Sequence, residues 1–210
     1  FTILESGVCM EETLSESEKD KAFLINTEAV SFLAKTCAEN NCFLIQISTD
    51  YVFDGETNLP YEEDDFTNPH SVYGESKREG EISAFDENPK IVVVRTSWLY
   101  SEVNKNFMKT MLNLFPQKDE MNIVNDQFGQ PTNANDLAEA VMSIIKSENK
   151  VSGILHFSNY PETTWFQFAQ KIAEFSKSKI KLTPITTAEF PTPAQRPMRS
   201  TMSFDKMEKT

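Results

Sequence analysis

The sequence is short of basic residues, cysteines and long apolar runs, and each shortage argues against a class of protein. Lys and Arg total 20 against 32 Asp and Glu, which gives a net charge of −12. A surface this acidic repels phosphate backbones, which argues against nucleic acids and anionic membranes as partners. The three cysteines, Cys9, Cys37 and Cys42, have neither C-x-x-C spacing nor the density of a disulfide framework. We therefore expect reduced thiols and a cytoplasmic protein.

No apolar run approaches the roughly 18 residues that a transmembrane helix needs, and the N-terminus lacks the basic and apolar regions of a signal peptide. The chain has 210 residues, enough for one substantial core and a small additional lobe. It starts at Phe1 without an initiator Met and stops at Thr210 within a helical pattern. We therefore expect that both ends are truncated.

Alternating strand and helix patterns indicate an α/β protein with a parallel sheet. The apolar runs FLIQIS and IVVVRTS are typical of strands that are covered on both faces. Ligands of parallel sheets bind beyond the carboxyl ends of the strands, where Thr49 and Trp98 stand here. The helices expected in chain order are at 15–40, at 73–85, from Asn106, after a cap at Asn133 or Asn135, and after a cap at Thr163 or Thr164.

The helix expected at 73–85 begins with a Tyr-x-x-x-Lys pair. Tyr73 and Lys77 are four positions apart, so they share one face of a helix. An ammonium there stabilises a phenolate and lowers the pKa of the tyrosine, which can then exchange a proton near neutral pH. Taken alone, such pairs are common on solvated helices. Thr49, however, places a hydroxyl at a strand end 24 positions upstream, and a hydroxyl plus a proton-donating tyrosine suit the reduction of a carbonyl group.

Several further blocks occur in an order and at a spacing typical of one family. They are STDYVFDG, PYEEDD, NPHSVYGESKREGE, VRTSWLY, NFMKTML, NDQFGQPT and PTPAQRP. Together they resemble the dTDP-4-dehydrorhamnose reductases, which are extended short-chain dehydrogenases/reductases. The resemblance implies an α/β fold: a Rossmann-like parallel sheet, incomplete at its N-terminus here, with a small C-terminal substrate-binding lobe. It also implies that NADPH or NADH reduces the 4-keto group of a dTDP-linked deoxyhexose to give dTDP-L-rhamnose.

The resemblance assigns roles to individual residues. Thr49, Tyr73 and Lys77 match the family's catalytic hydroxyl, proton donor and lysine. Arg196 is the one cation in a nearly uncharged stretch, which suits contact with a diphosphate. The expected cofactor-binding residues are Val8, Ile47, Tyr73 and Lys77, and the expected substrate-binding residues are Thr49, Asp50, Trp98 and Arg196.

The chain departs from the family pattern near its start. Met10 stands where the family has a threonine against the cofactor, and no G-x-x-G-x-x-G loop for the pyrophosphate occurs. We expect that the first β-α units are missing, and that these residues alone would aggregate and bind dinucleotide and substrate poorly. The residue that selects NADH or NADPH would lie in the missing part.

The chain is predicted to divide between two units. Residues 1–100 form the later part of the cofactor-binding domain, 123–147 return to it, and 101–122 with 148–210 form the substrate-binding lobe. His70 and His156 lack partners at metal-ligand spacing, and the acids at 62–65 are typical of a solvated loop, so no metal site is predicted. The helical spacing of Trp165, Phe168 and Ile172 is typical of core packing.

Two other functions stay open at this point. The beta subunit of methionine adenosyltransferase has a similar STDYVFDG block on a reductase fold but serves as a regulatory partner. A nucleotide-sugar epimerase would retain an oxidised cofactor. Trp98 and NDQFGQPT favour the reductase. We expect a dTDP-linked deoxyhexose as substrate and neither nucleic acid nor membrane as partner, while the oligomeric state, including a homodimer, stays open.

Overall fold

The protein is described by a computed structural model that covers residues 2–4, 12–147 and 151–209. Within these residues the main sheet has four parallel strands in the order β1-β2-β3-β8. All residues of β2 and β3 are buried, as the unbroken apolar runs predict. The predicted α/β class with a parallel sheet is confirmed. The strands are β1 (Thr2–Leu4), β2 (Leu44–Thr49), β3 (Val92–Thr96) and β8 (Gly153–His156).

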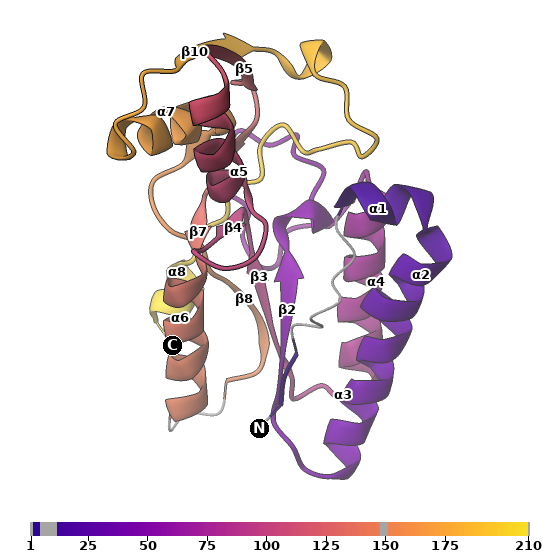
Figure 1. Cartoon of the computed structure of the whole chain (residues 1–210). Helices are drawn as coiled ribbons and strands as arrows, with labels where there is room; N and C mark the ends of the chain where they lie inside the picture. The colour runs from indigo at the N-terminus through magenta and orange to yellow at the C-terminus, as the bar shows by residue number, and fades with distance from the viewer. Residues whose placement is uncertain (1, 5–11, 148–150, 210) are drawn as a thin grey trace.

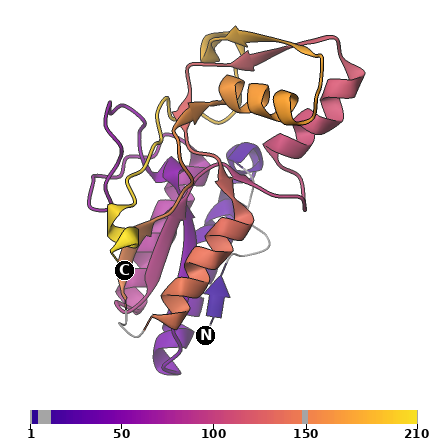
Figure 2. The same cartoon turned by 90° about the vertical axis from the view of Figure 1, so that its left-hand side faces the viewer.

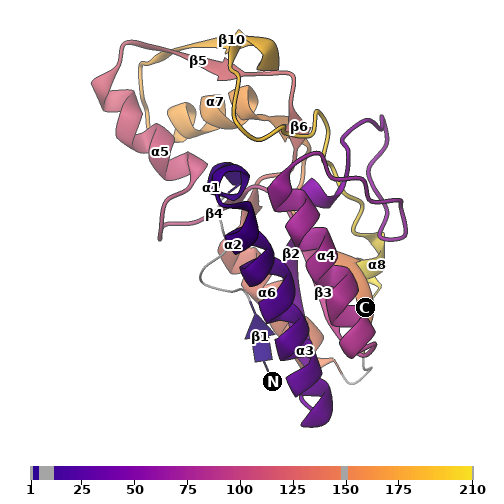
Figure 3. The ribbon, with the colours of Figure 1, turned by 90° about the vertical axis from the view of Figure 1, so that its right-hand side faces the viewer.

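Helices cover both faces of the main sheet (Figure 1). Figure 2 shows α6 in front of one face, and Figure 3 shows α2, α3 and α4 in front of the other. The alternation of side chains along β3 directs Val93 toward α3 and α4, and Val94 toward α6. The helices are α1 (Glu12–Ser17), α2 (Lys19–Phe23), α3 (Ala29–Glu39), α4 (Val72–Glu87) and α6 (Ala134–Lys146).

The helix expected at 15–40 is not continuous. It breaks after α1, and a π-helical turn, η1 (Leu24–Glu28), separates α2 from α3. This turn lies against α4, where the amide of Asn26 donates a hydrogen bond to Ser76 Oγ at 3.0 Å. A Cβ at Gly80 of α4 would collide with the Asn26 carbonyl oxygen. The local sequence of 15–40 carries no sign of this long-range contact.

A smaller lobe lies beyond the carboxyl ends of the main-sheet strands (Figure 1). Its two-stranded parallel sheet joins β5 (Glu120–Val124) to β10 (Lys181–Ile185). Two helices pack on this sheet, α5 (Phe107–Leu114) and α7 (Trp165–Phe175). The remaining short elements are η2 (Asp50–Val52), β4 (Leu99–Tyr100), η3 (Phe115–Gln117), β6 (Phe128–Gly129), β7 (Thr132–Asn133), β9 (Thr163–Thr164), η4 (Thr187–Glu189) and α8 (Asp205–Glu208).

Side chains cap the helices near the positions that the sequence predicts. Asn106 caps α5, Asn133 caps α6 and Thr164 caps α7, and each accepts a hydrogen bond from a backbone N–H of the first turn. In the described part of the chain, none of the helices has the length and apolar character needed to span a bilayer.

The division of the chain between the two units stays a prediction, but the pairing of one segment bears on it. Residues 153–156, which the prediction places in the lobe, form β8 and pair with β3 along the main sheet. The physical reason is burial: Leu155 is enclosed between β3 and α6, and His156 lies beside Arg95 of β3. The chain therefore enters the lobe, returns to the main sheet as β8, and enters the lobe again.

Candidate active site

A cleft of about 1020 Å³ lies between the main sheet and the lobe. This volume is at the upper end of the range for small-molecule sites, roughly 300–1,000 Å³. Its walls include the carboxyl ends of β2 and β3 on one side, and α5 and β5 on the other. Val8, which was also predicted, is outside the described residues. The cleft is lined by seven of the eight predicted site residues: Ile47, Thr49, Asp50, Tyr73, Lys77, Trp98 and Arg196.

Thr49 stands at the point where β2 ends and the chain turns into η2. Its Oγ1 accepts a hydrogen bond from the backbone N–H of Tyr51 at 3.3 Å, and its hydroxyl donates to Asp50 Oδ1 at 3.1 Å. A hydroxyl has one proton to donate. Thr49 must therefore rotate away from the Asp50 carboxylate before it can donate to a ligand in the cleft.

The first turn of α4 holds Tyr73 close to this strand end. Ser71 caps the helix by accepting a hydrogen bond from the N–H of Gly74 at 3.1 Å. A Cβ at Gly74 would collide with the carbonyl oxygen of Tyr51, so glycine allows α4 to lie directly against η2. The ring of Tyr51 meets the ring of Tyr73 edge-on, with centroids 5.7 Å apart and planes at 75°. These contacts bring Tyr73 from α4 to the same cleft wall as Thr49.

Lys77 lies one turn further along α4. Its Nζ donates a hydrogen bond to the carbonyl oxygen of Ile47 at 2.7 Å, and the residue is only 8% exposed. A neutral carbonyl orients the ammonium without neutralising its charge. The charge therefore stays available to stabilise a phenolate or to bind a polar ligand group.

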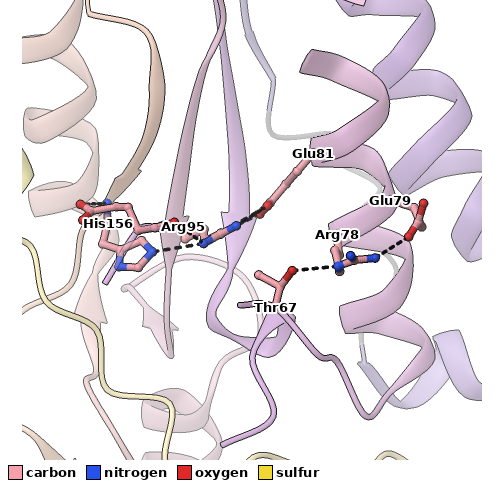
Figure 4. Close-up of polar contacts among 7 residues, drawn as sticks. Thr67, Arg78, Glu79, Glu81, Arg95 and His156 are labelled. Carbon is pink, nitrogen blue, oxygen red and sulfur yellow. Dashed lines mark hydrogen bonds and ion pairs between the residues drawn. The ribbon is translucent and has the colours of Figure 1, made fainter. Parts of the chain in front are cut away.

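A buried ion pair fixes α4 on the sheet (Figure 4). Glu81, one turn beyond Lys77 on α4, accepts hydrogen bonds from Arg95 Nε at 3.0 Å and Arg95 Nη2 at 2.7 Å. Arg95 Nη1 faces His156 Nε2 at 3.5 Å, and His156 Nδ1 lies 3.2 Å from the carbonyl oxygen of Ser203. Burial, and then the Arg95 charge, lower the pKa of His156 to about 3. The imidazole is therefore neutral, with its proton on Nδ1 and its Nε2 lone pair facing Arg95.

The loop before α4 is bound to the same region of the molecule. Arg78 Nε donates to Thr67 Oγ1 at 2.8 Å, and Arg78 Nη1 pairs with Glu79 at 2.8 Å (Figure 4). Glu63, in the acidic run, accepts a hydrogen bond from the backbone N–H of His156 at 3.2 Å. At least this one acid of the run is buried rather than solvated. Across the described ranges, no group of three or more His, Cys, Asp or Glu residues has the arrangement of a metal site.

Trp98 forms the cleft wall just beyond the end of β3. Its ring stacks on Trp165, the first residue of α7, with centroids 3.5 Å apart and planes at 6°. Trp165 packs against the core of the lobe, as its helical spacing predicts, and it also lines the cleft, which the spacing does not predict. Nothing in a helical spacing of apolar residues separates an aromatic residue of a cleft from one of the core.

Sequence reasoning also missed several polar residues of the cleft. Lys105 and Lys118 add positive charge to the walls that Arg196 and Lys77 already line. Thr96, which pairs in register with Thr49, is buried, and its Oγ1 has no hydrogen-bond partner in the described structure. The signal that could have indicated Thr96 is its place at the carboxyl end of a buried strand.

A parallel sheet flanked by helices, with a Tyr-Lys pair beside the carboxyl end of a central strand, defines a Rossmann-like α/β protein whose ligand site lies between sheet and lobe. Residues 9–210 match the family model described as the RmlD substrate binding domain. The chain belongs to this family.

Relatives of known name agree with this assignment. A dTDP-4-dehydrorhamnose reductase of Sinorhizobium fredii is 43% identical over 205 residues, which cover 93% of this chain and 69% of the relative. The crystal structure of a dTDP-4-dehydrorhamnose reductase from Clostridium acetobutylicum shares 41% identity at a TM-score of 0.92, and the match covers 96% of this chain and 71% of that one. The same reductase from Bacillus anthracis, in complex with NADP, shares 34% identity at a TM-score of 0.91, over 95% and 70% of the two chains.

Proposed function

We propose that the protein is an NAD(P)H-dependent reductase that converts the 4-keto group of dTDP-4-dehydrorhamnose to a hydroxyl, giving dTDP-L-rhamnose. One observation carries the proposal: Thr49, Tyr73 and Lys77, from β2 and α4, line a single cleft in a chain of this family. The proposed substrate follows from the names of the relatives, and the NADP complex of one relative supports the proposed cofactor.

In the proposed reaction, Tyr73 donates its phenolic proton to the oxygen of the reduced carbonyl group. Thr49 donates a hydrogen bond to the same oxygen once it has left Asp50, and so stabilises the negative charge that develops there. Lys77, which the Ile47 carbonyl orients, stabilises the phenolate that remains. Proton and charge are thus handled by three side chains at one end of the parallel sheet.

The described part of the cleft suits a nicotinamide cofactor. Thr96 Oγ1 and Ser48 Oγ are buried in the cleft lining without a hydrogen-bond partner in the described structure, so a bound dinucleotide could satisfy them. Ile47, Tyr73 and Lys77 would hold the nicotinamide ribose side. When bound, the cofactor supplies the hydride that reduces the carbonyl carbon.

The nucleotide sugar would occupy the lobe side of the cleft. Arg196, Lys105 and Lys118 supply positive charge for a diphosphate, in a protein that is acidic elsewhere. The sugar ring, in contrast to the diphosphate, must reach the sheet side of the cleft to meet Thr49 and Tyr73. Asp50 and Trp98 stand on this side. A cytoplasmic location and a homodimer stay predictions.

The test is the substitution Tyr73→Phe in the full-length protein, assayed with dTDP-4-dehydrorhamnose by loss of NADPH absorbance. We expect kcat to fall roughly 100-fold or more, because general acid catalysis is lost, while KM changes little. Tyr160→Phe is the control, since Tyr160 is exposed and outside the cleft lining. Unchanged turnover of Tyr73→Phe would remove Tyr73 from the mechanism, and an inactive wild type that binds NAD(P)H would favour the regulatory-subunit alternative.

A further inference from the structure

The two tryptophans of the sequence meet across the boundary between the main sheet and the lobe. Trp98 follows β3, and Trp165 starts α7 of the lobe. Their planes differ by 6° and their ring centroids are 3.5 Å apart. Both residues line the cleft. The stack is therefore a direct contact between the two walls that enclose the proposed substrate.

The backbone at Trp98 is strained. Its φ of +48° lies in the left-handed region, which is unfavourable for a bulky residue. The surrounding structure compensates for this strain, because the Trp98 carbonyl accepts a hydrogen bond from the N–H of Thr132 at 3.2 Å and the ring stacks on Trp165. Strain of this kind persists only where the surrounding contacts hold the residue in place.

Both faces of the Trp98 ring are covered. Trp165 occupies one face, and at a centroid distance of 3.5 Å no backbone fits between the rings. A Cβ at Gly129 would lie 2.6 Å from Trp98 Cε2, so the Gly129 backbone abuts the opposite face. Since Trp98 nevertheless lines the cleft, a ligand meets the edge of its ring. Stacking of a sugar or base on this ring would require Trp165 or Gly129 to move.

The lobe fixes Trp165 independently. Its Nε1 donates a hydrogen bond to Gln127 Oε1 at 3.1 Å, and Gln127 is buried and donates to Thr187 Oγ1 at 3.1 Å. The ring of Phe107 packs on Trp165 with centroids 4.7 Å apart. The lobe thus holds Trp165 in place, and the stack with Trp165 in turn fixes the ring of Trp98.

We infer that Trp165 is a positioning residue for the proposed reaction: it holds Trp98 edge-on to the cleft and so sets the lobe relative to Thr49 and Tyr73. The inference rests on the proposed function. Its consequence is that Trp165 governs binding of the nucleotide sugar, although the reacting atoms lie against other residues. Losing the stack should raise KM for the sugar nucleotide, with a much smaller effect on kcat and on KM for NADPH.

The test uses Trp165→Ala, Trp165→Phe and Gly129→Ala in the full-length protein. We expect Trp165→Ala to raise KM for dTDP-4-dehydrorhamnose roughly tenfold, while Trp165→Phe retains a stacked ring and recovers most of the loss. Gly129→Ala keeps both tryptophans but displaces Trp98, so it should raise KM like Trp165→Ala. Phe175→Ala, on the same helix but 83% exposed, is the matched control.

Near-ultraviolet circular dichroism supplies a second readout. Two parallel indoles at this distance couple, and the coupled signal should disappear in both Trp165 variants and weaken in Gly129→Ala, with Phe175→Ala unchanged. An unchanged KM in Trp165→Ala and Gly129→Ala, with altered dichroism or thermal stability alone, would reduce Trp165 to a structural residue and overturn the inference. If Trp165→Ala does not fold, the result with Gly129→Ala decides.

A titration with dTDP separates failure of the inference from failure of the proposed function. If wild type lacks reductase activity but binds dTDP, the proposed function fails, and weaker dTDP binding by Trp165→Ala still supports the positioning role. If Trp165→Ala and Gly129→Ala bind dTDP as tightly as wild type does, the positioning role is overturned. A wild type that neither reduces the sugar nor binds dTDP overturns both.

Discussion

Replacing His156 with glutamine should make the fold less sensitive to acid. The imidazole is fully buried between β8, β3 and the segment that contains Ser203. Burial and the Arg95 guanidinium lower its pKa to about 3, whereas the same ring in the unfolded chain has a pKa of about 6.5. Folded and unfolded protein therefore differ in bound protons across this interval.

The sign of the effect follows from this difference. As pH falls through 6.5, the unfolded chain takes up a proton that the folded protein does not bind, so the free energy of unfolding decreases. Between pH 6 and pH 5 the loss is about 1 kcal/mol, and it hardly depends on the folded-state pKa while that stays well below 5. The stabilisation is fully present above pH 6.5, and the decline ends near pH 3.

The assay is urea unfolding at pH 7, 6 and 5, followed by tryptophan fluorescence. Glu63, Glu81 and Lys206 lie near His156 in wild type and variant alike, so their contributions cancel in the comparison. We expect wild type to lose about 1 kcal/mol more than His156→Gln between pH 6 and pH 5. His70→Gln is the control for removal of an exposed imidazole. Equal slopes for wild type and His156→Gln would show that the buried ring takes up its proton in the folded state.

Three further substitutions test the cleft and the contacts that hold α4 beside it. Thr96→Val removes a buried hydroxyl that has no partner in the described structure, so thermal stability should be kept or improved. Calorimetry should show that NADPH binds roughly tenfold more weakly, and unchanged affinity would exclude Thr96 from the cofactor site. Glu81→Gln leaves the Arg95 charge buried without its carboxylate. The free energy of unfolding, measured in urea, should fall by about 3–5 kcal/mol, and a loss under about 1 kcal/mol would mean that solvent reaches the pair. Gly74→Ala should push α4 away from Tyr51 and reduce kcat more than the control Glu75→Ala, which alters an exposed neighbour; wild-type kinetics would show that Tyr73 tolerates the shift.

Sequence patterns predict the elements whose cause is local. The runs around β2 and β3 are apolar throughout because both faces of these strands are covered, and this is visible in the residues themselves. Tyr73 and Lys77 share a helix face because of their spacing alone. Their assembly with Thr49 in one cleft follows from a general property of parallel sheets, whose carboxyl ends lie at one edge.

The features that sequence reasoning missed depend on contacts between distant segments. GILH looks the same whether it joins the main sheet or the lobe, and only pairing with β3 decides. The π-helical turn at Leu24–Glu28 lies against Gly80, about fifty positions later. Trp165 has the spacing of a core residue and packs against the lobe core, but it also stacks on Trp98, which follows β3, and lines the cleft. Local patterns carry no information about such partners.

The interleaved path of the chain has a consequence for synthesis on the ribosome. Strand β5 finds its only described partner in β10, and between them the chain adds α6 and β8 to the main sheet. The apolar side of α5 and η3, with Met111 and Phe115, therefore stays exposed until α7 and β10 have been translated. Such nascent surfaces bind chaperones and are prone to aggregate. The lobe, and the cleft that it closes, must be completed late in translation, after the β-α core of the main sheet has been available to fold.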